Sequence, residues 1–385
     1  MIKLCRSNMN CLQEWPEPIV RVQSLSESRL DAIPSRYVKP LLERPLGGLS
    51  ATASENIDIP VIDLGGLSSG FGDTKGHCRL SPLSQQQGTK TTTAMMKRMS
   101  EACKEWGFFQ VVNHGIDGDV MDRAREVWRE FFKLPMEAKQ RYANSPSTYE
   151  GYGSRLGVEK GAILDWSDYY FLHYLPSEIR DHGKWPSQPP YHREITEQYL
   201  QQVTQLGTTL MKLLSLNLGL NPKRLLDAFG GEDDIGACLR VNFYPRCPQP
   251  DLTLGLSSHS DPGGMTLLLP DPNVPGLQVR KDGKWVTVKP EPHAFIVNIG
   301  DQIQVLSNGM YKSVEHRVIV NPNQERVSLA LFYNPRADLL IQPIKELVTS
   351  ITPSLYSPMT FNEYRLFIRS RGPSGKSHVE SLKKK

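Results

Sequence analysis

Hydrophobic and polar positions repeat with different periods in the two halves of this chain. Apolar residues recur at helical spacing over residues 94–106, 118–132 and 195–218, and each stretch predicts an amphipathic helix. Beyond residue 235 the pattern shortens to alternation, which is typical of strands with one buried face. The chain is therefore expected to join a helical N-terminal module to a β-rich C-terminal core.

Short strands separated by Gly, Pro and Asn turns are expected throughout the C-terminal core. They are residues 236–244, 266–269, 277–279, 285–288, 294–297, 313–320 and 327–333. The sequence KDGK at residues 281–284 predicts a hairpin turn, because Asp and Gly tolerate the left-handed backbone that such turns need. So many short strands in roughly a hundred residues favour a double-stranded β-helix, or jelly roll, with helices packed outside it.

The other stretches are expected to be less regular. Residues 59–64 and 108–114 are predicted strands, whereas residues 65–93 are rich in Gly, Ser, Gln and Thr and are expected to form a loop. Short helices are predicted at 24–32 and 360–370. The chain divides into an N-terminal arm at 1–57, an N-terminal module at 58–175, linking helices at 176–234, the jelly-roll core at 235–340, and a C-terminal helix and tail at 341–385.

Composition narrows the class of protein without identifying it. Apolar residues make up 39% of the chain and charged residues 22%, which are the proportions of a globular enzyme. The net charge of +4 is dispersed, so nucleic acid is not an expected partner. No run reaches the roughly 18 apolar residues of a membrane helix, and residues 1–20 lack the apolar core of a secretory signal. We expect a cytoplasmic monomer, with access to the nucleus left open, that binds a small molecule.

The cysteines and one early histidine show no ligand pattern. The 6 cysteines are scattered without C-x-x-C spacing, and in a reducing compartment they are expected to stay as thiols. His114 follows a predicted strand, with no carboxylate or imidazole nearby in the sequence. We interpret it as a structural hydrogen-bonding residue in preference to a metal ligand.

A His-Ser-Asp sequence at residues 259–261 is the first candidate for metal chemistry. Alternation at a strand or its end projects residues two apart to the same side, so His259 and Asp261 can reach one ion. His316 lies on another predicted strand. Two imidazoles and one carboxylate on one face of an octahedral metal form the facial triad of iron(II) oxygenases, which leaves positions open for co-substrate and O2. A lone H-x-D occurs by chance in many chains, so the hypothesis depends on its neighbours.

Two strands supply polar neighbours of the right kind. Arg326 and Ser328 alternate toward the same interior, and a buried guanidinium there needs an anion such as the distal carboxylate of 2-oxoglutarate. Arg240, Asn242 and Tyr244 share one face of their predicted strand. If that face is the barrel interior, Asn242 and Tyr244 can bind the same co-substrate while Arg240 serves another ligand. A solvent-facing strand surface is the alternative.

These motifs resemble, in order and spacing, those of the plant 2-oxoglutarate-dependent dioxygenases along nearly the whole chain. FFQVVNHG at 108–115 resembles the N-terminal module of that family, and NFYP at 242–245 resembles the strand before its metal site. The resemblance implies a jelly-roll fold and a hydroxylase that uses Fe(II), 2-oxoglutarate and O2, with ascorbate as reductant. It implies that His259, Asp261 and His316 bind the iron.

Other segments resemble one subfamily, the jasmonate-induced oxygenases. They are EWPEP at 14–18, GYGSRLG at 151–157, DWSDYYF at 165–171 and GKSHVES at 375–381. This resemblance implies conversion of jasmonic acid to 12-hydroxyjasmonic acid, which lowers hormone signalling and defence, and it implies Phe171 and Phe332 as apolar walls of the substrate pocket. The stretch 67–92 is longer and less regular than the subfamily pattern, which bears on that loop and not on the chemistry.

An acidic substrate would also suit the predicted C-terminal helix. Arg365 and Arg369 are four residues apart and therefore share one helical face. If the helix caps the mouth of the barrel, they form with Arg240 a three-arginine site for a carboxylate such as that of jasmonic acid. From the residues alone, a solvated basic face is the alternative.

Two other functions stay open at this stage. A flavonoid-type dioxygenase similar to anthocyanidin synthase would need a pocket for a planar polyphenol in place of the arginines. A jelly-roll protein could also bind metal or hormone without catalysis. The joint presence of the triad and the Arg-x-Ser pair argues against that second alternative.

Overall fold

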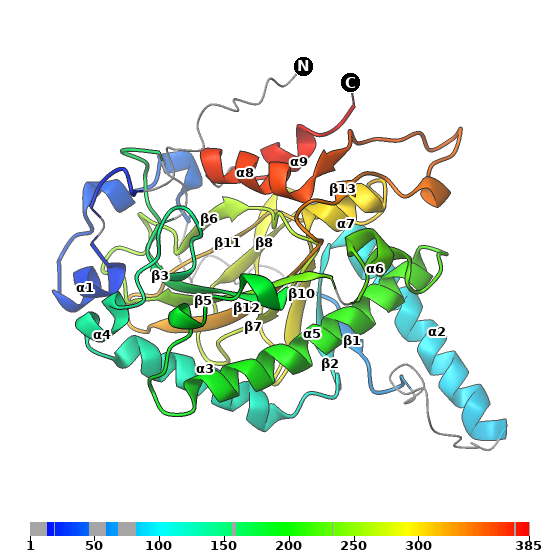
Figure 1. Ribbon diagram of the computed structural model, residues 1–385, viewed down its shortest axis with the longest axis horizontal. Helices are drawn as coiled ribbons and strands as arrows, with labels where there is room; N and C mark the ends of the chain where they lie inside the picture. Colours follow the sequence, from blue (N-terminus) through cyan, green and yellow to red (C-terminus); the bar gives the residue numbers. More distant parts are fainter. Residues whose placement is uncertain are drawn as a thin grey trace.

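The strands of this chain form two facing sheets surrounded by helices (Figure 1). The computed structural model describes residues 14–18, 20–45, 59–67, 82–155, 159–232, 234–372 and 375–384. Within them, the larger sheet has 8 strands in the order β1-β2-β10-β7-β12-β5-β4-β3, and the smaller has 4 in the order β6-β11-β8-β9. This arrangement confirms the predicted jelly roll with flanking helices.

The larger sheet joins the N-terminal module to the C-terminal core. Its strands are β1 (Val61–Asp63), β2 (Phe108–Val112), β3 (Gly151–Gly153), β4 (Asp168–Leu175), β5 (Gly236–Tyr244), β7 (Met265–Leu269), β10 (Phe295–Ile299) and β12 (Arg326–Asn334). Strands β5 and β12 pair over their full length, from Arg326 opposite Tyr244 to Asn334 opposite Gly236. Alternate residues of both strands therefore share one face of this sheet.

The smaller sheet contains short strands from the core alone. They are β6 (Leu256–His259), β8 (Leu277–Lys281), β9 (Lys284–Thr287) and β11 (His316–Val318). Asp282 and Gly283 join β8 to β9 with φ angles of 49° and 79°, so the predicted tight turn is confirmed. A separate two-stranded sheet pairs β13 (Leu340–Ile341) with β14 (Met359–Thr360).

Helices cover the large sheet and one end of the barrel. They are α1 (Val22–Glu27), α2 (Pro82–Glu105), α3 (Gly118–Lys133), α4 (Met136–Gln140), α5 (His192–Asn217), α6 (Arg224–Phe229), α7 (Asp301–Leu306), α8 (Phe361–Arg371) and α9 (Ser377–Glu380). Short 3-10 turns lie at Ser35–Tyr37, Leu41–Glu43, Ser177–Ile179, His182–Lys184 and Lys345–Leu347. Helices α3 and α5 pack together across the outer face of the sheet, while α8 lies at the other side of the barrel (Figure 1).

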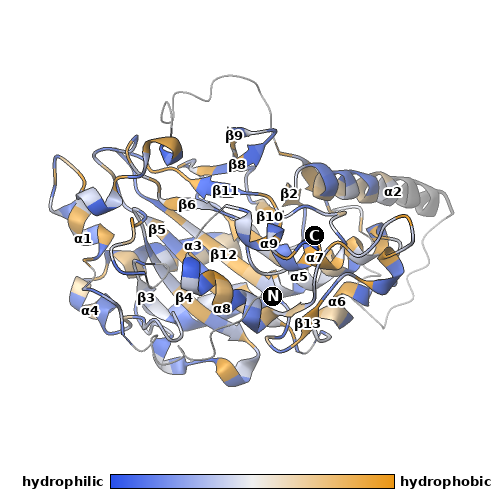
Figure 2. Ribbon diagram, turned by 90° about the horizontal axis from the view of Figure 1, so that it is seen from above, coloured by the Kyte–Doolittle hydropathy of each residue, from blue (hydrophilic) through white to orange (hydrophobic). Residues whose placement is uncertain are grey.

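The main apolar core lies between these helices and the large sheet. Helix α3 directs Trp128 and Phe131 at Tyr170 of β4, with ring centroids 5.1 and 5.0 Å apart. Burial of a large side chain contributes roughly 1.5–3 kcal/mol, so this interface fixes the sheet against its helical layer. The helices show apolar and polar faces accordingly (Figure 2). The opposite face of β5 and β12 is thereby left for the polar residues of the barrel interior.

The predicted 65–93 loop is wrong over its second part. Helix α2 begins at Pro82, whereas residues 68–81 lie outside the described part of the chain. Proline is tolerated in the first helical turn, and the Gln, Lys and Ala residues that follow have good helix propensity. Apolar residues farther along α2, including Met99 and Cys103, are buried in the core and anchor the helix. Tertiary packing therefore extends a helix whose first half lacks apolar periodicity.

Other differences concern short strands and the largely buried strand β4. Strands β3 and β4 were not predicted, and the expected strand at 313–320 is reduced to β11, which is 3 residues long. The predicted N-terminal helix is the shorter α1, and residues 1–13 and 46–57 of the proposed arm lie outside the described residues. Strand β4 is buried at five of its positions, so its polar and apolar residues do not follow an exposed and buried alternation.

Candidate active site

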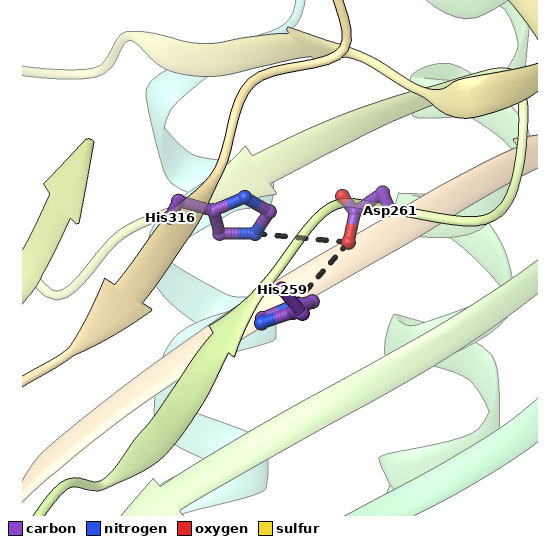
Figure 3. Close-up of side chains that lie close together, drawn as sticks. All are labelled: His259, Asp261 and His316. Atoms are coloured by element: carbon purple, nitrogen blue, oxygen red, sulfur yellow. Dashed lines mark ion pairs between the residues drawn. The ribbon is translucent and has the colours of Figure 1, made fainter. Parts of the chain in front are cut away.

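Three possible metal ligands converge between the two sheets. His259 ends β6 and His316 begins β11, and these residues are paired directly across the two strands. Oδ1 of Asp261 lies 3.5 Å from Nε2 of His259 and 3.7 Å from Nε2 of His316 (Figure 3). The three ligand atoms lie within 4.8 Å of one another. The fold thus brings together the residues of the predicted triad.

Hydrogen bonds to the backbone orient both imidazole rings. Nδ1 of His259 lies 2.8 Å from the carbonyl oxygen of Ser257, and Nδ1 of His316 lies 3.1 Å from that of Val314. A carbonyl oxygen accepts a hydrogen bond, so the proton of each neutral ring resides on Nδ1. Each Nε2 is therefore the ring nitrogen that faces Asp261.

Asp261 is oriented by two residues that the sequence analysis did not single out. Its Oδ2 accepts hydrogen bonds from Thr266 Oγ1 at 2.5 Å and from Asn298 Nδ2 at 2.7 Å. Thr266 of β7 and Asn298 of β10 are cross-strand partners. Because that pairing joins distant segments, no local pattern pointed to either residue. The two bonds leave Oδ1 of Asp261 facing the imidazoles.

The protonation states of the cluster fit a cation. Burial, assisted by the nearby His259, lowers the pKa of His316 to about 4. Burial raises the pKa of Asp261, but the charge of His316 and the hydrogen bond from His259 outweigh it, so this pKa lies well below its usual range. At neutral pH the cluster contains a carboxylate and a neutral imidazole. Two nitrogen donors and one oxygen donor suit Fe(II) with coordination positions left open.

A buried guanidinium lies in the same cavity as the triad. Arg326 is 4% exposed, and its Nε donates to the carbonyl oxygen of Val274 at 3.2 Å while its Nη1 donates to Ser328 Oγ at 3.2 Å. Its guanidinium carbon lies 5.2 Å from the centre of the Tyr244 ring. Among the described residues, none forms an ion pair with Arg326. A buried cation with neutral partners is prepared for an anionic ligand.

The predicted polar face of β5 points into the barrel. Arg240, Asn242 and Tyr244 all line the cavity that contains the triad, so they are not part of a solvent-facing surface. Arg240 Nε donates to Asn242 Oδ1 at 2.6 Å, and its guanidinium stacks 4.2 Å from the centre of the Tyr169 ring. Asn242 is the cross-strand partner of Ser328. The two predicted polar pairs therefore occupy neighbouring positions on one sheet face.

Helix α8 brings two more guanidinium groups to this cavity. A capping box of Thr360 and Glu363 starts the helix, and Arg365 and Arg369 line the cavity with Arg240. Burial and the neighbouring charge of Arg365 lower the pKa of Arg369 to about 10. Nε of Arg365 is buried without a hydrogen-bond partner. The helix therefore covers the barrel mouth, and a solvated basic face is not observed.

The cavity has a volume of about 390 Å³, and apolar side chains line it together with the charged groups. Phe171 and Phe332 line it as expected from the resemblance. Further lining residues were not predicted, because they come from five separate elements and have the apolar side chains of ordinary core positions. They are Leu256, Leu277, Val318, Ala330 and Ile368. A largely apolar molecule with one carboxylate fits this lining.

The remaining predictions have simple outcomes. His114 Nε2 lies 2.9 Å from the carbonyl oxygen of His293, and the N–H of Ile116 donates to His114 Nδ1, which is a structural role. Cys103, Cys238 and Cys247 are buried free thiols, whereas Cys5, Cys11 and Cys78 lie outside the described residues. None of the helices described is both long and apolar enough to span a lipid bilayer.

Comparison with known proteins identifies the class. Residues 235–335 match the family model of the 2OG-Fe(II) oxygenase superfamily, and residues 59–190 match that of the non-haem dioxygenase in morphine synthesis N-terminal region. The chain therefore belongs to the 2OG-Fe(II) oxygenase superfamily and is a 2-oxoglutarate-dependent dioxygenase with Fe(II) as its metal. The first match falls within the predicted core at 235–340, whereas the second covers most of the predicted module at 58–175 and extends into the linking segment.

Individual relatives and one solved structure are similar to this chain over nearly its whole length. The chain is 61% identical to jasmonate-induced oxygenase 2 of Arabidopsis thaliana over 370 residues, covering 96% of this chain and 94% of the relative. It is 35% identical to leucoanthocyanidin dioxygenase of Malus domestica, covering 91% and 96%. The crystal structure of JOX2 in complex with 2OG, Fe and JA superimposes with a TM-score of 0.85 at 59% identity, covering 97% of this chain and 100% of that one.

Proposed function

We propose that this chain hydroxylates jasmonic acid to 12-hydroxyjasmonic acid and thereby lowers jasmonate signalling and defence responses. The observation that carries the proposal is that a possible iron site and a set of arginines share one largely apolar cavity. The possible iron ligands and Arg326 line this cavity together with Arg240, Arg365 and Arg369. The likeness to the jasmonate-induced oxygenases and to the JOX2 complex with JA supports this substrate.

His259, Asp261 and His316 would hold the iron. Arg326 and Ser328 would bind the distal carboxylate of 2-oxoglutarate, with Asn242 and Tyr244 donating to the same co-substrate. When bound, iron and 2-oxoglutarate supply the oxidation: 2-oxoglutarate and O2 give succinate and CO2, and the second oxygen atom enters the substrate as hydroxyl. The chain itself orients a C–H bond toward the metal and keeps water away with Phe171 and Phe332.

The arginine set supports a carboxylic acid as the substrate. Guanidinium groups that are partly removed from water are unfavourable unless an anion balances them. Arg365 and Arg369 are on adjacent turns of α8, and the lowered pKa of Arg369 reflects that burial and mutual repulsion. A carboxylate would relieve both effects and would fix the opposite end of jasmonic acid near the iron ligands.

The two alternative functions have weaker support. A dihydroflavonol has no carboxylate to pair with the arginines, although relatives such as leucoanthocyanidin dioxygenase are 35% identical. A binding protein without catalysis would not require a buried Arg326 that has no ion-pair partner among the described residues, beside a cluster with open coordination positions. The cavity chemistry therefore favours jasmonic acid hydroxylation over either alternative.

One assay tests the class and the substrate together. Purified protein would be incubated with Fe(II), ascorbate, 2-oxoglutarate, O2 and either jasmonic acid or a dihydroflavonol. We expect succinate release and a product heavier by one oxygen atom from jasmonic acid only, with the hydroxyl located at C12 by fragmentation. Turnover of the dihydroflavonol alone would favour the flavonoid alternative, and no succinate with any substrate would favour a binding protein.

A further inference from the structure

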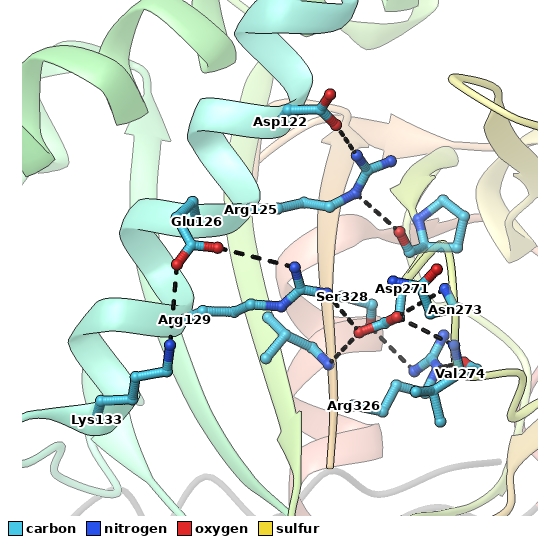
Figure 4. Close-up of polar contacts among 12 residues, drawn as sticks. Asp122, Arg125, Glu126, Arg129, Lys133, Asp271, Asn273, Val274, Arg326 and Ser328 are labelled. Atoms are coloured by element: carbon cyan, nitrogen blue, oxygen red, sulfur yellow. Dashed lines mark hydrogen bonds and ion pairs between the residues drawn. The ribbon is translucent and has the colours of Figure 1, made fainter. Parts of the chain in front are cut away.

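An ion pair lies behind Arg326, between helix α3 and the turn that follows β7. Nη2 of Arg129 lies 2.8 Å from Oδ2 of Asp271, and their side chains are 26% and 3% exposed (Figure 4). Arg129 projects from α3 toward this turn, with Glu126 on its outer side at 3.9 Å. The pair thus connects the helical layer to the segment next to the barrel wall.

Both oxygens of Asp271 are fully used. Oδ1 accepts from the backbone N–H groups of Asn273 and Val274 at 3.0 and 3.1 Å. Oδ2 accepts from Arg129 and also from the N–H of Val327 at 3.2 Å. Burial raises the pKa of Asp271, but these hydrogen bonds outweigh it and hold the pKa below its ordinary value. The side chain is therefore an anion at neutral pH.

These bonds reach Arg326 by two routes. The carbonyl oxygen of Val274, whose N–H is bound by Asp271, accepts the hydrogen bond from Arg326 Nε. The N–H of Val327, which Asp271 also binds, belongs to the residue next to Arg326 in β12. The backbone of Arg326 and the plane of its guanidinium thus depend on one carboxylate that lies outside the cavity wall.

We propose that Asp271 is a positioning residue for 2-oxoglutarate and that Arg129 supports it. Together they hold the guanidinium group of Arg326 in the orientation that a distal carboxylate requires. The inference rests on the proposed role of Arg326. A two-pronged guanidinium is sensitive to orientation, because both N–H groups must align with both carboxylate oxygens. Neither Asp271 nor Arg129 is among the residues that line the cavity.

Asp271→Asn tests the carboxylate with almost no change in shape. An amide offers one oxygen, so it can accept from the turn or from Val327 and Arg129, but not from both. Either orientation leaves a donor facing a donor, and hydrogen bonds to charged groups are strong enough for the loss to be measured. We expect the KM for 2-oxoglutarate to rise about tenfold in Asp271→Asn and about threefold to tenfold in Arg129→Gln.

The specific readout is the binding of two 2-oxo acids, each measured with the full-length protein loaded with Fe(II). 2-Oxopentanoate has the same metal-chelating end as 2-oxoglutarate but no distal carboxylate. Its inhibition constant should be unchanged in both variants, because it has no distal carboxylate to bind the guanidinium group of Arg326. The KM for jasmonic acid should also stay within about twofold. Glu126→Gln is the matched control, since it removes the outer partner of Arg129 and leaves Asp271 intact.

The outcomes separate this inference from the function on which it rests. Arg326→Lys is measured in parallel, and if it leaves 2-oxoglutarate kinetics unchanged, the proposed co-substrate site is wrong. If Arg326→Lys is impaired but Arg129→Gln and Asp271→Asn bind 2-oxoglutarate normally, only the positioning role is overturned. Equal weakening of 2-oxopentanoate and 2-oxoglutarate would indicate general loosening and would also overturn it. Should Asp271→Asn fail to fold, Arg129→Gln, which changes the more exposed partner of the ion pair, tests the positioning role by the same measurements.

Discussion

At the scale of single residues, a hydrogen bond to one atom of a side chain selects which other atom can bind a ligand. Nδ1 of His259 is engaged by a backbone carbonyl, which leaves Nε2 for a metal. Oδ2 of Asp261 is engaged by Thr266 and Asn298, which leaves Oδ1. The donor atoms are therefore oriented before any metal binds, so the loss of one side chain cannot be compensated by rotation of another.

The first prediction concerns the three proposed ligands. His259→Ala, Asp261→Ala and His316→Ala should each reduce jasmonic acid turnover by at least about a hundredfold, because two protein ligands hold iron weakly. Iron retained after gel filtration, measured by absorption spectroscopy, should fall in parallel. The assays should contain no added halide, which could replace the lost carboxylate. Near-normal activity in any one of the variants would contradict the assignment.

A second prediction distinguishes charge from geometry at Arg326. Arg326→Lys keeps the positive charge but replaces a planar fork with a single ammonium group. The KM for 2-oxoglutarate should rise about tenfold or more, while that for jasmonic acid should change less than about twofold. Steady-state kinetics with each substrate varied in turn would measure both. An equal rise for the two substrates would contradict a role specific to 2-oxoglutarate.

A third prediction concerns Arg365 and Arg369, the proposed partners of the substrate carboxylate. Hydrogen bonds to charged groups contribute roughly 1.5–3 kcal/mol, so Arg365→Ala or Arg369→Ala should lower kcat/KM for jasmonic acid about tenfold to a hundredfold. Affinity for 2-oxoglutarate should barely move. Methyl jasmonate carries no charge and serves as the matched substrate control. It should be a poor substrate of the unmodified chain, and its kcat/KM should fall much less on mutation. Equal losses of kcat/KM for acid and ester would argue against binding of the substrate carboxylate by these arginines.

At the scale of elements, strand β4 forms part of the cavity wall through an irregular register. Its residues pair with β5 from Asp168 to Leu175, and the register shifts between His173 and Leu175. Oε1 of Glu150, the residue before β3, accepts a hydrogen bond from the N–H of His173 at 3.0 Å. A single buried carboxyl group therefore supports the strand where its regular pairing is interrupted.

This carboxyl group leads to a fourth prediction, about pH. Burial raises the pKa of Glu150 from 4.5 to about 7, so the folded protein binds this proton more tightly than the unfolded chain. The resulting stabilisation is full below about pH 4.5 and is lost as the pH rises through 7. Between pH 5 and pH 8 the free energy of unfolding should fall by about 2 kcal/mol more than in Glu150→Gln. Urea denaturation of both proteins would measure this, and parallel pH profiles would contradict it.

At the scale of the whole molecule, the site exists only where the two sheets face each other. His259 and His316 belong to the small sheet, whereas Arg326 and Ser328 belong to the large one. A metal bound to the first pair and to 2-oxoglutarate would therefore connect both sheets through one ligand. Because such ligands bind the folded chain and not the unfolded one, they should stabilise the entire fold.

The fifth prediction follows from this bridging. Mn(II), as a redox-inert substitute for Fe(II), together with 2-oxoglutarate at about a hundred times its Kd should stabilise the fold by about 2.7 kcal/mol. For a chain of this size that raises Tm by about 3 °C. Differential scanning fluorimetry would record it, with His316→Ala as a control that should show almost no shift. A similar shift in that variant would mean that the ligands bind elsewhere.

Sequence pattern alone determined the features that depend on residues close together along the chain. Alternation located β5 and β12 and placed Arg326 with Ser328 and Arg240 with Asn242, because strand geometry repeats every two residues. The helical spacing of Arg365 and Arg369 placed them on one face for a similar reason. The jelly-roll fold followed from the density of short strands, and the order of the motifs identified the family.

Only the tertiary structure decided which of these local faces meet. The cross-strand pairing of His259 with His316, the bonds from Thr266 and Asn298, and the covering of the barrel by α8 all join segments far apart in the sequence. Helix α2 likewise extends into a polar stretch because its distant apolar half is anchored in the core. Pairing of this kind is selected by packing and loop closure over the whole chain. The periodicity of residues within a short window therefore does not predict which distant segments pair.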